Sequence, residues 1–365
     1  MKVILLTTGL RTGGAERVVV DIADELFSRG FQVSIISLIS DIQVRPKNCN
    51  LLVLSFNFNK NIFNFITKLI KLLYYIRKQR PDVIHSHMFH ANIIAALIGF
   101  FIRNIKIICT SHSSNEGGKF KMFLYRILLR KPGMLTTVSK DAAQQIQKLT
   151  NINNIPVIEN GIDVDKFYFN NTKRVEVRKK LSISDDKIVI MGVGRLVEAK
   201  GFSNLIEAFY SLCQVFDNIC LIIVGDGEEK NKLLKKIDVY NLHNQVKLIG
   251  SSNEVHNLLP ACDLFVSSSI WEGFSLVVAE AMSCQRVVVA TDCGAVANMI
   301  IDSRFLLEIN DIDALFLKLK SALLLNANES DRIGLLSREK IISNYNKQMM
   351  VDKWICYYEN SVIEE

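Results

Sequence analysis

Short apolar runs alternate with stretches of helical periodicity along almost the whole chain, and this alternation constrains the fold more than any other feature. Strand-like runs separated by helices predict a parallel sheet with helices on both faces. The first series of such runs lies at 3–6, 33–38, 51–54, 83–85, 105–109 and 135–138. A polar, charged stretch, 168–186, interrupts the series, and a second series begins at 187–194. We therefore expect an α/β protein with two doubly wound domains, 1–168 and 169–345, facing a central cleft.

Composition and cysteine spacing favour a cytoplasmic protein. Hydrophobic residues make up 49% of the 365 residues, which is enough for two buried cores. The eight cysteines form no C-x-x-C pair and lie mostly in apolar segments, which favours reduced thiols over disulfides or a zinc site. The apolar start of the chain leads directly into a glycine loop, so we interpret it as a core strand rather than a signal peptide. The longest uninterrupted apolar run, 93–102, is about half as long as a membrane-spanning helix requires.

Positive charge is concentrated in the first half of the chain. Residues 1–160 carry 21 Lys and Arg against 9 Asp and Glu, whereas the remainder carries 23 against 28. Two stretches rich in aromatic and aliphatic residues, 57–80 and 119–131, contain six and five basic residues and no acidic ones. Such helices suit an anionic membrane surface or a phosphorylated acceptor. The alternative is a pair of core-facing helices with solvated lysines. We expect no nucleic-acid partner, because the sequence contains no recognition module.

Two carboxylates, Glu272 and Glu280, lie eight residues apart between two strand-like runs, 263–269 and 286–291. The sequence predicts that Glu272 lies on a loop and that Glu280 lies roughly two turns into a buried helix. Ligands of parallel sheets bind at the carboxyl ends of strands, where the amides of helix N-termini point. Two acids in such a place suggest a polyhydroxylated, phosphate-bearing ligand.

Two cations and a glycine-rich loop also follow strand-like runs. Arg195 and Lys200 lie between a buried strand and a helix, and both could bind one anion. The alternative is a pair of solvated surface cations. The first loop, 9–17, reads G-x-x-x-G-G, and Gly14 is its last glycine. Dinucleotide-binding proteins have the pattern G-x-G-x-x-G instead. This pattern disfavours a dehydrogenase. It leaves a phosphate- or sugar-binding loop or a purely structural turn.

The histidines do not form a convincing metal site in the sequence. His85, His87 and His90 lie close together, but no acidic partner is near, so we interpret them as side chains that line a cleft. His112 follows another strand-like run, a position that favours contact with a ligand, although a lone histidine is more often structural. The two D-x-D sequences that begin at Asp163 and Asp311 do not follow a strand with a partner acid, and we regard them as incidental.

Together these residues resemble the retaining glycosyltransferases of family 4, which have the GT-B fold of two Rossmann-like domains. The resemblance covers most of the chain. It is carried by Gly13-Gly14-Ala-Glu-Arg17, Ile158-Glu-Asn-Gly-Ile-Asp163, Gly194-Arg195-Leu196, Lys200-Gly201, Gly225-Asp-Gly227, and Glu272 with Glu280. The resemblance implies an N-terminal acceptor-binding domain and a C-terminal domain that binds a nucleotide-sugar. It also implies a final helix within 346–365 that crosses back to the N-terminal domain.

The resemblance further implies a role for each matching residue. Arg195 and Lys200 would hold the diphosphate of the donor, Glu272 would lie at the donor sugar, and Glu280 would bind the ribose of the nucleotide. Backbone amides of five consecutive residues would meet the phosphates and the sugar hydroxyls: Gly273, Phe274, Ser275, Leu276 and Val277. His112 would lie near the reacting sugar, and Gly14 would back the phosphates.

Fixed positive charge would stabilise the departing diphosphate, so we expect no metal ion and no other cofactor. We expect a retaining transferase that moves a sugar, from UDP-hexose or UDP-N-acetylhexosamine, to a lipid-diphosphate-linked glycan. O-antigen or capsule synthesis at the cytoplasmic face of the membrane is the expected setting. Two alternatives stay open at this point: a nucleotide-sugar epimerase of the same fold, and a non-catalytic nucleotide-sugar-binding subunit.

Overall fold

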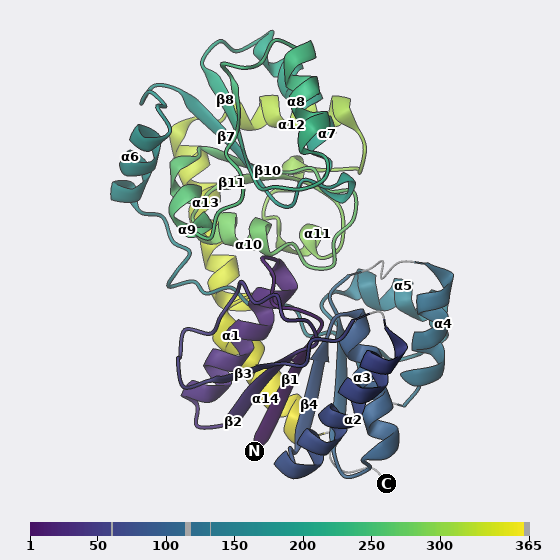
Figure 1. Ribbon diagram of the computed structural model, residues 1–365. Helices are drawn as coiled ribbons and strands as arrows, with labels where there is room; N and C mark the ends of the chain where they lie inside the picture. The colour runs from purple at the N-terminus through teal and green to yellow at the C-terminus, as the bar shows by residue number, and fades with distance from the viewer. Residues whose placement is uncertain (60, 114–117, 132, 361–365) are drawn as a thin grey trace. The chain divides into compact units, whose positions relative to one another are not determined.

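Two six-stranded parallel sheets, each flanked by helices, make up the chain (Figure 1). The computed structural model describes residues 1–59, 61–113, 118–131 and 133–360. These residues divide into an N-terminal unit, formed by residues 1–161 and the end of the chain from Lys347, and a C-terminal unit, Ile162–Asn346. The prediction of two doubly wound domains is confirmed. The last five residues of the expected final segment, 361–365, lie outside the described residues.

The strands of the N-terminal unit are β1 (Lys2–Thr7), β2 (Gln32–Ser37), β3 (Leu52–Ser55), β4 (Val83–His87), β5 (Lys106–Ser111) and β6 (Leu135–Thr137). They pair in the order β3-β2-β1-β4-β5-β6, so the sheet grows outward in both directions from β1. Val3 on β1 pairs with Val33 on β2 and with Val83 on β4. Four consecutive residues of β1, from Val3 to Leu6, are fully buried, as expected for a central strand that is covered on both faces.

The helices of this unit are α1 (Gly14–Ser28), α2 (Ile62–Gln79), α3 (Phe89–Phe101), α4 (Lys119–Leu128), α5 (Lys140–Thr150) and α14 (Lys347–Asn360). Helix α14 packs beside α1, although more than 300 residues separate them in the sequence (Figure 1). Trp354 and Tyr358 of α14 are buried, and the Tyr357 hydroxyl donates a hydrogen bond to the carbonyl oxygen of Gly133 at 2.7 Å. Apolar burial therefore holds α14 within the N-terminal unit.

The strands of the C-terminal unit are β7 (Ile188–Val193), β8 (Ile219–Val224), β9 (Val246–Leu248), β10 (Leu264–Ser267), β11 (Val287–Thr291) and β12 (Leu306–Leu307). Their order, β12-β11-β10-β7-β8-β9, is the same doubly wound pattern around β7. Strand β12 was not predicted, because a strand of two residues is too short to give a recognisable pattern in the sequence.

The helices of the C-terminal unit are α6 (Asn171–Lys180), α7 (Phe202–Cys213), α8 (Lys230–Val239), α9 (Val255–Leu258), α10 (Leu276–Ser283), α11 (Val296–Met299), α12 (Ile312–Leu323) and α13 (Ala327–Asn344). Single-turn 3₁₀ helices lie at Glu198–Lys200, Leu259–Ala261 and Ser303–Phe305. The unit begins at Ile162, whose amide donates to the carbonyl oxygen of Tyr345 at 2.7 Å. Residues 162–168 therefore group with the C-terminal unit, whereas the sequence placed them at the end of the first domain.

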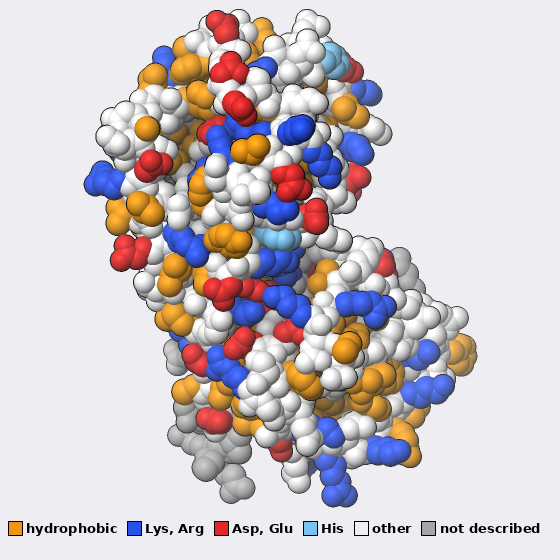
Figure 2. All heavy atoms as spheres, turned by 90° about the vertical axis from the view of Figure 1, so that its left-hand side faces the viewer, with side chains coloured by type: hydrophobic (Ala, Val, Ile, Leu, Met, Phe, Trp, Pro, Cys, Tyr) orange, Lys and Arg blue, Asp and Glu red, His pale blue; other side chains and the backbone are white. Residues whose placement is uncertain are grey.

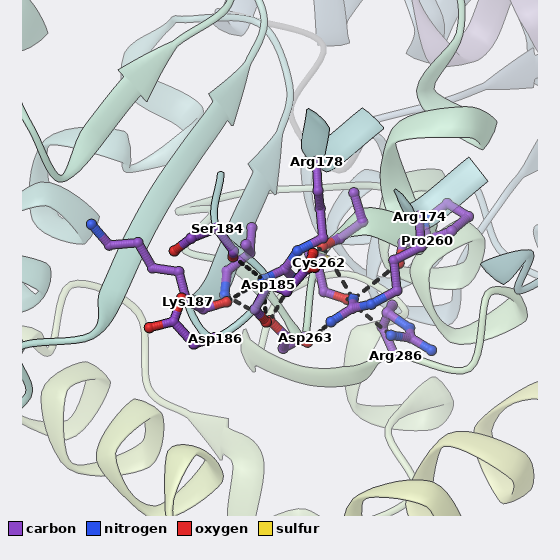
Figure 3. A network of polar contacts seen from close by, with 12 residues as sticks. Arg174, Arg178, Ser184, Asp185, Asp186, Lys187, Pro260, Cys262, Asp263 and Arg286 are labelled. Carbon is purple, nitrogen blue, oxygen red and sulfur yellow. Dashed lines mark hydrogen bonds and ion pairs between the residues drawn. The ribbon is translucent and has the colours of Figure 1, made fainter. Parts of the chain in front are cut away.

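A network of polar contacts, centred on the partly exposed Asp263 and including the buried Arg178, fastens α6 to the amino-terminal edge of the second sheet (Figure 3). Asp263, just before β10, accepts from Arg174 at 2.5 Å, from Arg178 at 3.3 Å, and from the Val189 amide at 2.7 Å. The side chain of Arg178 is only 3% exposed, and it also donates to the carbonyl oxygens of Ala261 and of the loop before β7. One carboxylate therefore joins α6 to two strands.

We expect the Asp263→Ala substitution to lower the free energy of unfolding of the C-terminal unit by about 3–5 kcal/mol, because it leaves the buried Arg178 guanidinium without its counter-charge. Urea unfolding followed by tryptophan fluorescence and circular dichroism measures the change. The matched control is Glu176→Ala, which breaks an exposed ion pair with Lys173 on the same helix and should leave stability unchanged. An equal, small effect of both substitutions would contradict the role assigned to Asp263.

Candidate functional site

The carboxyl edge of the second sheet is formed by closely packed loops that leave no room for side chains at three glycines. A Cβ atom at Gly225 would lie 1.8 Å from the carbonyl oxygen of Gly194, and one at Gly201 would lie 2.1 Å from that of Ser268. Gly294, with φ of +62°, would place a Cβ 2.6 Å from the carbonyl oxygen of Gly273. The loops that follow β7, β8, β10 and β11 are therefore locked against one another by backbone contact.

Glu272 and Lys200 form an ion pair at this edge. The Lys200 ammonium donates to Glu272 Oε1, and the two side chains are 20% and 11% exposed. Ser269 Oγ donates to the same oxygen at 2.8 Å, and Ser275 Oγ does so at 3.4 Å. Three side-chain donors thus converge on one carboxylate oxygen. The structure brings Lys200 and Glu272 into direct contact, whereas the sequence reasoning gave them separate partners.

The segment predicted to contact phosphates forms the entrance to α10. Gly273 and Phe274 lie in the loop, Ser275 is the N-cap residue, and Leu276 and Val277 begin the helix. The Ser275 hydroxyl bonds to Glu272 and makes no side-chain capping bond, so it does not satisfy the first amides of the helix.

Glu280 is 3% exposed and is the fifth residue of α10, so it lies just over one turn into the helix. The expected position was about two turns. The helix begins later than predicted because Ser275 adopts an extended N-cap conformation. Arg195 is exposed, and in the part of the chain that the structure describes its side chain forms no hydrogen bond or ion pair.

Three histidines cluster at the carboxyl edge of the first sheet. His87 Nδ1 lies 3.0 Å from His112 Nε2, and the ring centroids of His85 and His87 are 4.0 Å apart. Two hydrogen bonds fix the ring of His85, whose nitrogens lie 2.7 Å from the hydroxyl oxygens of Tyr358 and Thr110. His87 Nε2 and His112 Nδ1 are buried and have no hydrogen-bond partner among the residues that the structure describes. His90 is not part of this group, because it lies on the exposed side of α3.

Burial keeps the clustered histidines neutral at physiological pH. Desolvation lowers the pKa of His112 to about 4. The pKa of His87 lies well below its ordinary value because of burial and, secondarily, the neighbouring rings of His85 and His112. Neutral imidazoles both donate and accept hydrogen bonds, so the cluster is suited to contact hydroxyl groups.

The other positions that the sequence singled out are Gly14 and the two D-x-D sequences. Gly14 is the exposed first residue of α1. Asp163 accepts from the Lys166 amide at 3.1 Å and Asp311 from the Ala314 amide at 2.8 Å, so both D-x-D sequences begin with an aspartate that serves a turn or a helix cap. Among the described residues no three His, Cys, Asp or Glu side chains are arranged to hold a metal ion.

The sequence reasoning assigned no role to Ser269 or Gly294, and it expected a final helix on the N-terminal domain without predicting the contact of its Tyr358 with His85. Ser269 lies three residues before Glu272 in a run of serines, and this proximity was the only available signal. Gly294 must be a glycine because the carbonyl oxygen of Gly273 leaves no room for a side chain there. Tyr358 of α14 forms a hydrogen bond with His85. Both contacts join residues that lie far apart in the sequence.

Comparison with protein families identifies both halves of the chain. Residues 12–166 match the model of Glycosyltransferase Family 4, and residues 173–344 match that of Glycosyl transferases group 1.

Several relatives with known names are similar to the chain. It is 26% identical over 334 residues to an N-acetylgalactosamine-N,N'-diacetylbacillosaminyl-diphospho-undecaprenol 4-alpha-N-acetylgalactosaminyltransferase of Campylobacter jejuni, covering 86% of this chain and 88% of that protein. It is 26% identical over 328 residues to a UDP-Gal:alpha-D-GlcNAc-diphosphoundecaprenol alpha-1,3-galactosyltransferase of Escherichia coli, covering 84% and 82%. An uncharacterized glycosyltransferase of Methanocaldococcus jannaschii is 28% identical over 246 residues; the match spans 63% of this chain and 60% of that protein.

Solved structures share the fold over nearly the whole chain. A glycosyltransferase from Rickettsia africae has a TM-score of 0.83 at 22% identity, with 98% of this chain and 99% of that chain covered. Anabaena HepE, solved in complex with UDP-glucose, has a TM-score of 0.83 at 19% identity, with 98% and 99% covered. At these identities the structural similarity establishes the fold.

We expect the free energy of unfolding of the N-terminal unit to fall as the pH is lowered from about 6.5 towards 4. Below pH 6.5 the unfolded chain protonates its histidines, whereas folded His112, with its pKa of about 4, stays neutral. Each such histidine gives a slope of about 1.4 kcal/mol per pH unit. Urea unfolding at a series of pH values measures the slope. His112→Gln should reduce this slope, because the variant lacks the buried imidazole. An equal slope in the variant and in the unmodified protein would contradict the prediction.

Proposed function

The chain belongs to the group 1 (family 4) glycosyltransferases, and on this basis we propose that it transfers a sugar from a nucleotide-sugar to a lipid-linked glycan with retention of configuration. The donor in this proposal is UDP-hexose or UDP-N-acetylhexosamine. The acceptor is a glycan on a polyprenyl diphosphate, used in the synthesis of a bacterial surface polysaccharide such as O-antigen or capsule. The names of the C. jejuni and E. coli relatives, which include diphospho-undecaprenol acceptors, support this choice.

The convergence of Lys200, Ser269 and Ser275 on Glu272 is the observation that carries the proposal. A nucleotide-sugar presents a diphosphate beside a ring of hydroxyl groups, so its site needs cations next to a hydrogen-bond acceptor. Lys200 would pass from Glu272 to the diphosphate when the donor binds, and Glu272 would then accept a hydrogen bond from a sugar hydroxyl. The exposed Arg195 guanidinium and the uncapped amides at the start of α10 would complete the binding of the phosphates.

These groups act on the step that breaks the bond between the anomeric carbon and the phosphate oxygen. Positive charge develops on the sugar, and the electron pair of the broken bond goes to the diphosphate. Fixed donors near that diphosphate lower the barrier because they need no reorganisation as the charge develops. This proposal therefore requires no metal ion. Retention follows from a covalent intermediate on a carboxylate or from attack on the face that the phosphate leaves.

The other predicted residues have subsidiary roles in the proposal. Glu280, buried in α10, would accept hydrogen bonds from the ribose diol and so orient the nucleotide. His112, in the N-terminal unit, would contact an oxygen of the reacting sugar, and the amide of Gly14 would contribute to phosphate binding. These roles rest on the family resemblance and stay predictions.

We also propose peripheral attachment to the inner face of the cell membrane. Among the described residues no helix has both the length and the hydropathy to cross a membrane. Helix α2 exposes Phe63, Ile70 and Tyr74 beside several lysines and arginines. On the face of the N-terminal unit that Figure 2 shows, hydrophobic and basic side chains are interspersed, together with some acidic ones. Such a mixture suits the headgroup region of an anionic bilayer.

A transfer assay tests the proposed function directly. The purified protein is incubated with UDP-glucose, UDP-galactose and their N-acetylated analogues, together with a synthetic polyprenyl-diphosphate sugar, and products are identified by mass spectrometry and by the NMR coupling of the new anomeric proton. We expect an α-linked product in the presence of EDTA. Release of free sugar or of an epimer from the donor alone would instead identify an epimerase. Donor binding without any reaction would identify a binding subunit.

We expect Lys200→Ala to lower kcat by about 10²–10³, or roughly 3–4 kcal/mol of transition-state stabilisation, because the diphosphate loses a fixed cation. Initial rates at saturating donor measure the change, and the thermal unfolding temperature shows whether the variant is folded. Lys235→Ala removes an exposed lysine of α8 and is the matched control. A folded Lys200→Ala protein with the kcat of the control would contradict the assignment.

A further inference from the structure

A cavity that the proposed function does not use lies near the ends of α4 and α5. Its volume is about 520 Å³, within the roughly 300–1,000 Å³ of small-molecule sites. Polar and basic side chains line it: Arg126, Arg130, Lys131, Asn151, Asn153 and Asn154. Leu135, at the first position of β6, is also part of its wall. The cavity therefore lies at the amino edge of the first sheet, opposite the carboxyl edge that carries His87 and His112.

The charge of this cavity is one-sided. Arg126, Arg130 and Lys131 contribute three positive charges, and no acidic residue is among the lining residues. Within the described ranges, none of the three side chains forms an ion pair or a hydrogen bond. The side-chain amides of the lining asparagines add neutral donors. Three unpaired cations around one concave surface attract an anion, and guanidinium groups bind phosphate oxygens with particular strength.

An exposed apolar surface adjoins these cations along α4. Phe120 is 72% exposed, Phe123 is 54% exposed and Ile127 is 46% exposed. On α4, Phe123 lies three residues before Arg126 and four before Ile127, so apolar and basic side chains share one exposed side of the helix. Arg130 follows just after the helix ends. A free inorganic phosphate has no part that such a surface would contact, whereas an amphiphile has both an anionic head and an apolar tail.

We propose that this cavity binds the phosphate headgroup of an anionic membrane phospholipid, with the adjoining aromatic and aliphatic side chains of α4 entering the acyl region. The proposal deepens the proposed membrane attachment and rests on it. The lipid in this cavity is a bilayer component and is neither the acceptor nor a product of the reaction. Its binding would hold the N-terminal unit on the membrane whether or not acceptor is present.

Vesicle binding tests the proposal. The full chain is sedimented with vesicles of equal parts phosphatidylglycerol and phosphatidylcholine, and separately with vesicles of phosphatidylcholine alone. The test variant is R126E/R130E. The matched control is K140E/K148E, which makes the same change of charge at exposed positions of α5 that do not line the cavity. All four positions are exposed, so we expect both variants to keep the unfolding temperature of the unmodified protein.

We expect the unmodified protein to bind the phosphatidylglycerol vesicles and the R126E/R130E variant to bind them at least about tenfold more weakly, because each cation near an anionic surface contributes about fivefold to binding. The K140E/K148E control should stay within about threefold of the unmodified protein. Equal losses in both variants would show a diffuse electrostatic effect and would overturn the proposal. Equal binding to phosphatidylcholine alone would overturn it as well.

Two further measurements distinguish a lipid headgroup from free phosphate, and failure of the lipid site from failure of the proposed transferase function. Saturable binding of inorganic phosphate that the R126E/R130E variant loses, with no loss of vesicle binding in that variant, would identify a free-phosphate site and overturn the lipid assignment. Sugar transfer to a water-soluble, short-chain acceptor should be the same in both variants and in the unmodified protein. If no sugar transfer occurs at all but the R126E/R130E variant alone loses vesicle binding, the proposed function fails and the lipid site stands.

Discussion

A parallel sheet brings the carboxyl ends of all its strands to one edge, and both units of this protein depend on that constraint. In the C-terminal unit the loops at this edge touch through their backbones, with glycine where Gly201 meets Ser268 and where Gly294 meets Gly273. This close packing fixes Glu272 against Lys200. The position of the ion pair is therefore set by the sheet and by glycines that allow the loops to approach.

The N-terminal unit applies the same constraint to a different chemistry. Here the edge carries neutral, buried histidines. Two residues of α14 contact one of them, His85: Tyr358 through a hydrogen bond and Trp354 through its ring. Helix α14 is thus part of the histidine cluster's support as well as of the fold. At the amino edge of the same sheet, basic residues and asparagines line a cavity. In our proposals, membrane contact and sugar chemistry would therefore lie at opposite edges of one sheet.

The sequence predicted several parts of the candidate site from local patterns. The positions of Arg195, Lys200 and Glu272 after strands followed from apolar runs and from the polar residues that end them. The contact between Lys200 and Glu272 was not predicted, because 72 residues separate them and each was expected to bind a part of the donor. Ser269 and Gly294 were missed for a related reason: one acts through its hydroxyl group and the other through its lack of a side chain, and neither leaves a periodic signal.

The sequence by itself determined the two doubly wound sheets, because hydrophobic periodicity is a local property that each strand and helix carries in its own residues. It also determined the concentration of positive charge in the first half of the chain. The resemblance to family 4 implied a final helix that returns to the N-terminal domain, and α14 lies in that unit. Only the tertiary structure decided that residues 162–168 group with the C-terminal unit and that three donors share one oxygen of Glu272. These outcomes depend on burial and backbone contact between residues far apart in the chain, and such contacts have no counterpart in the local pattern of the sequence.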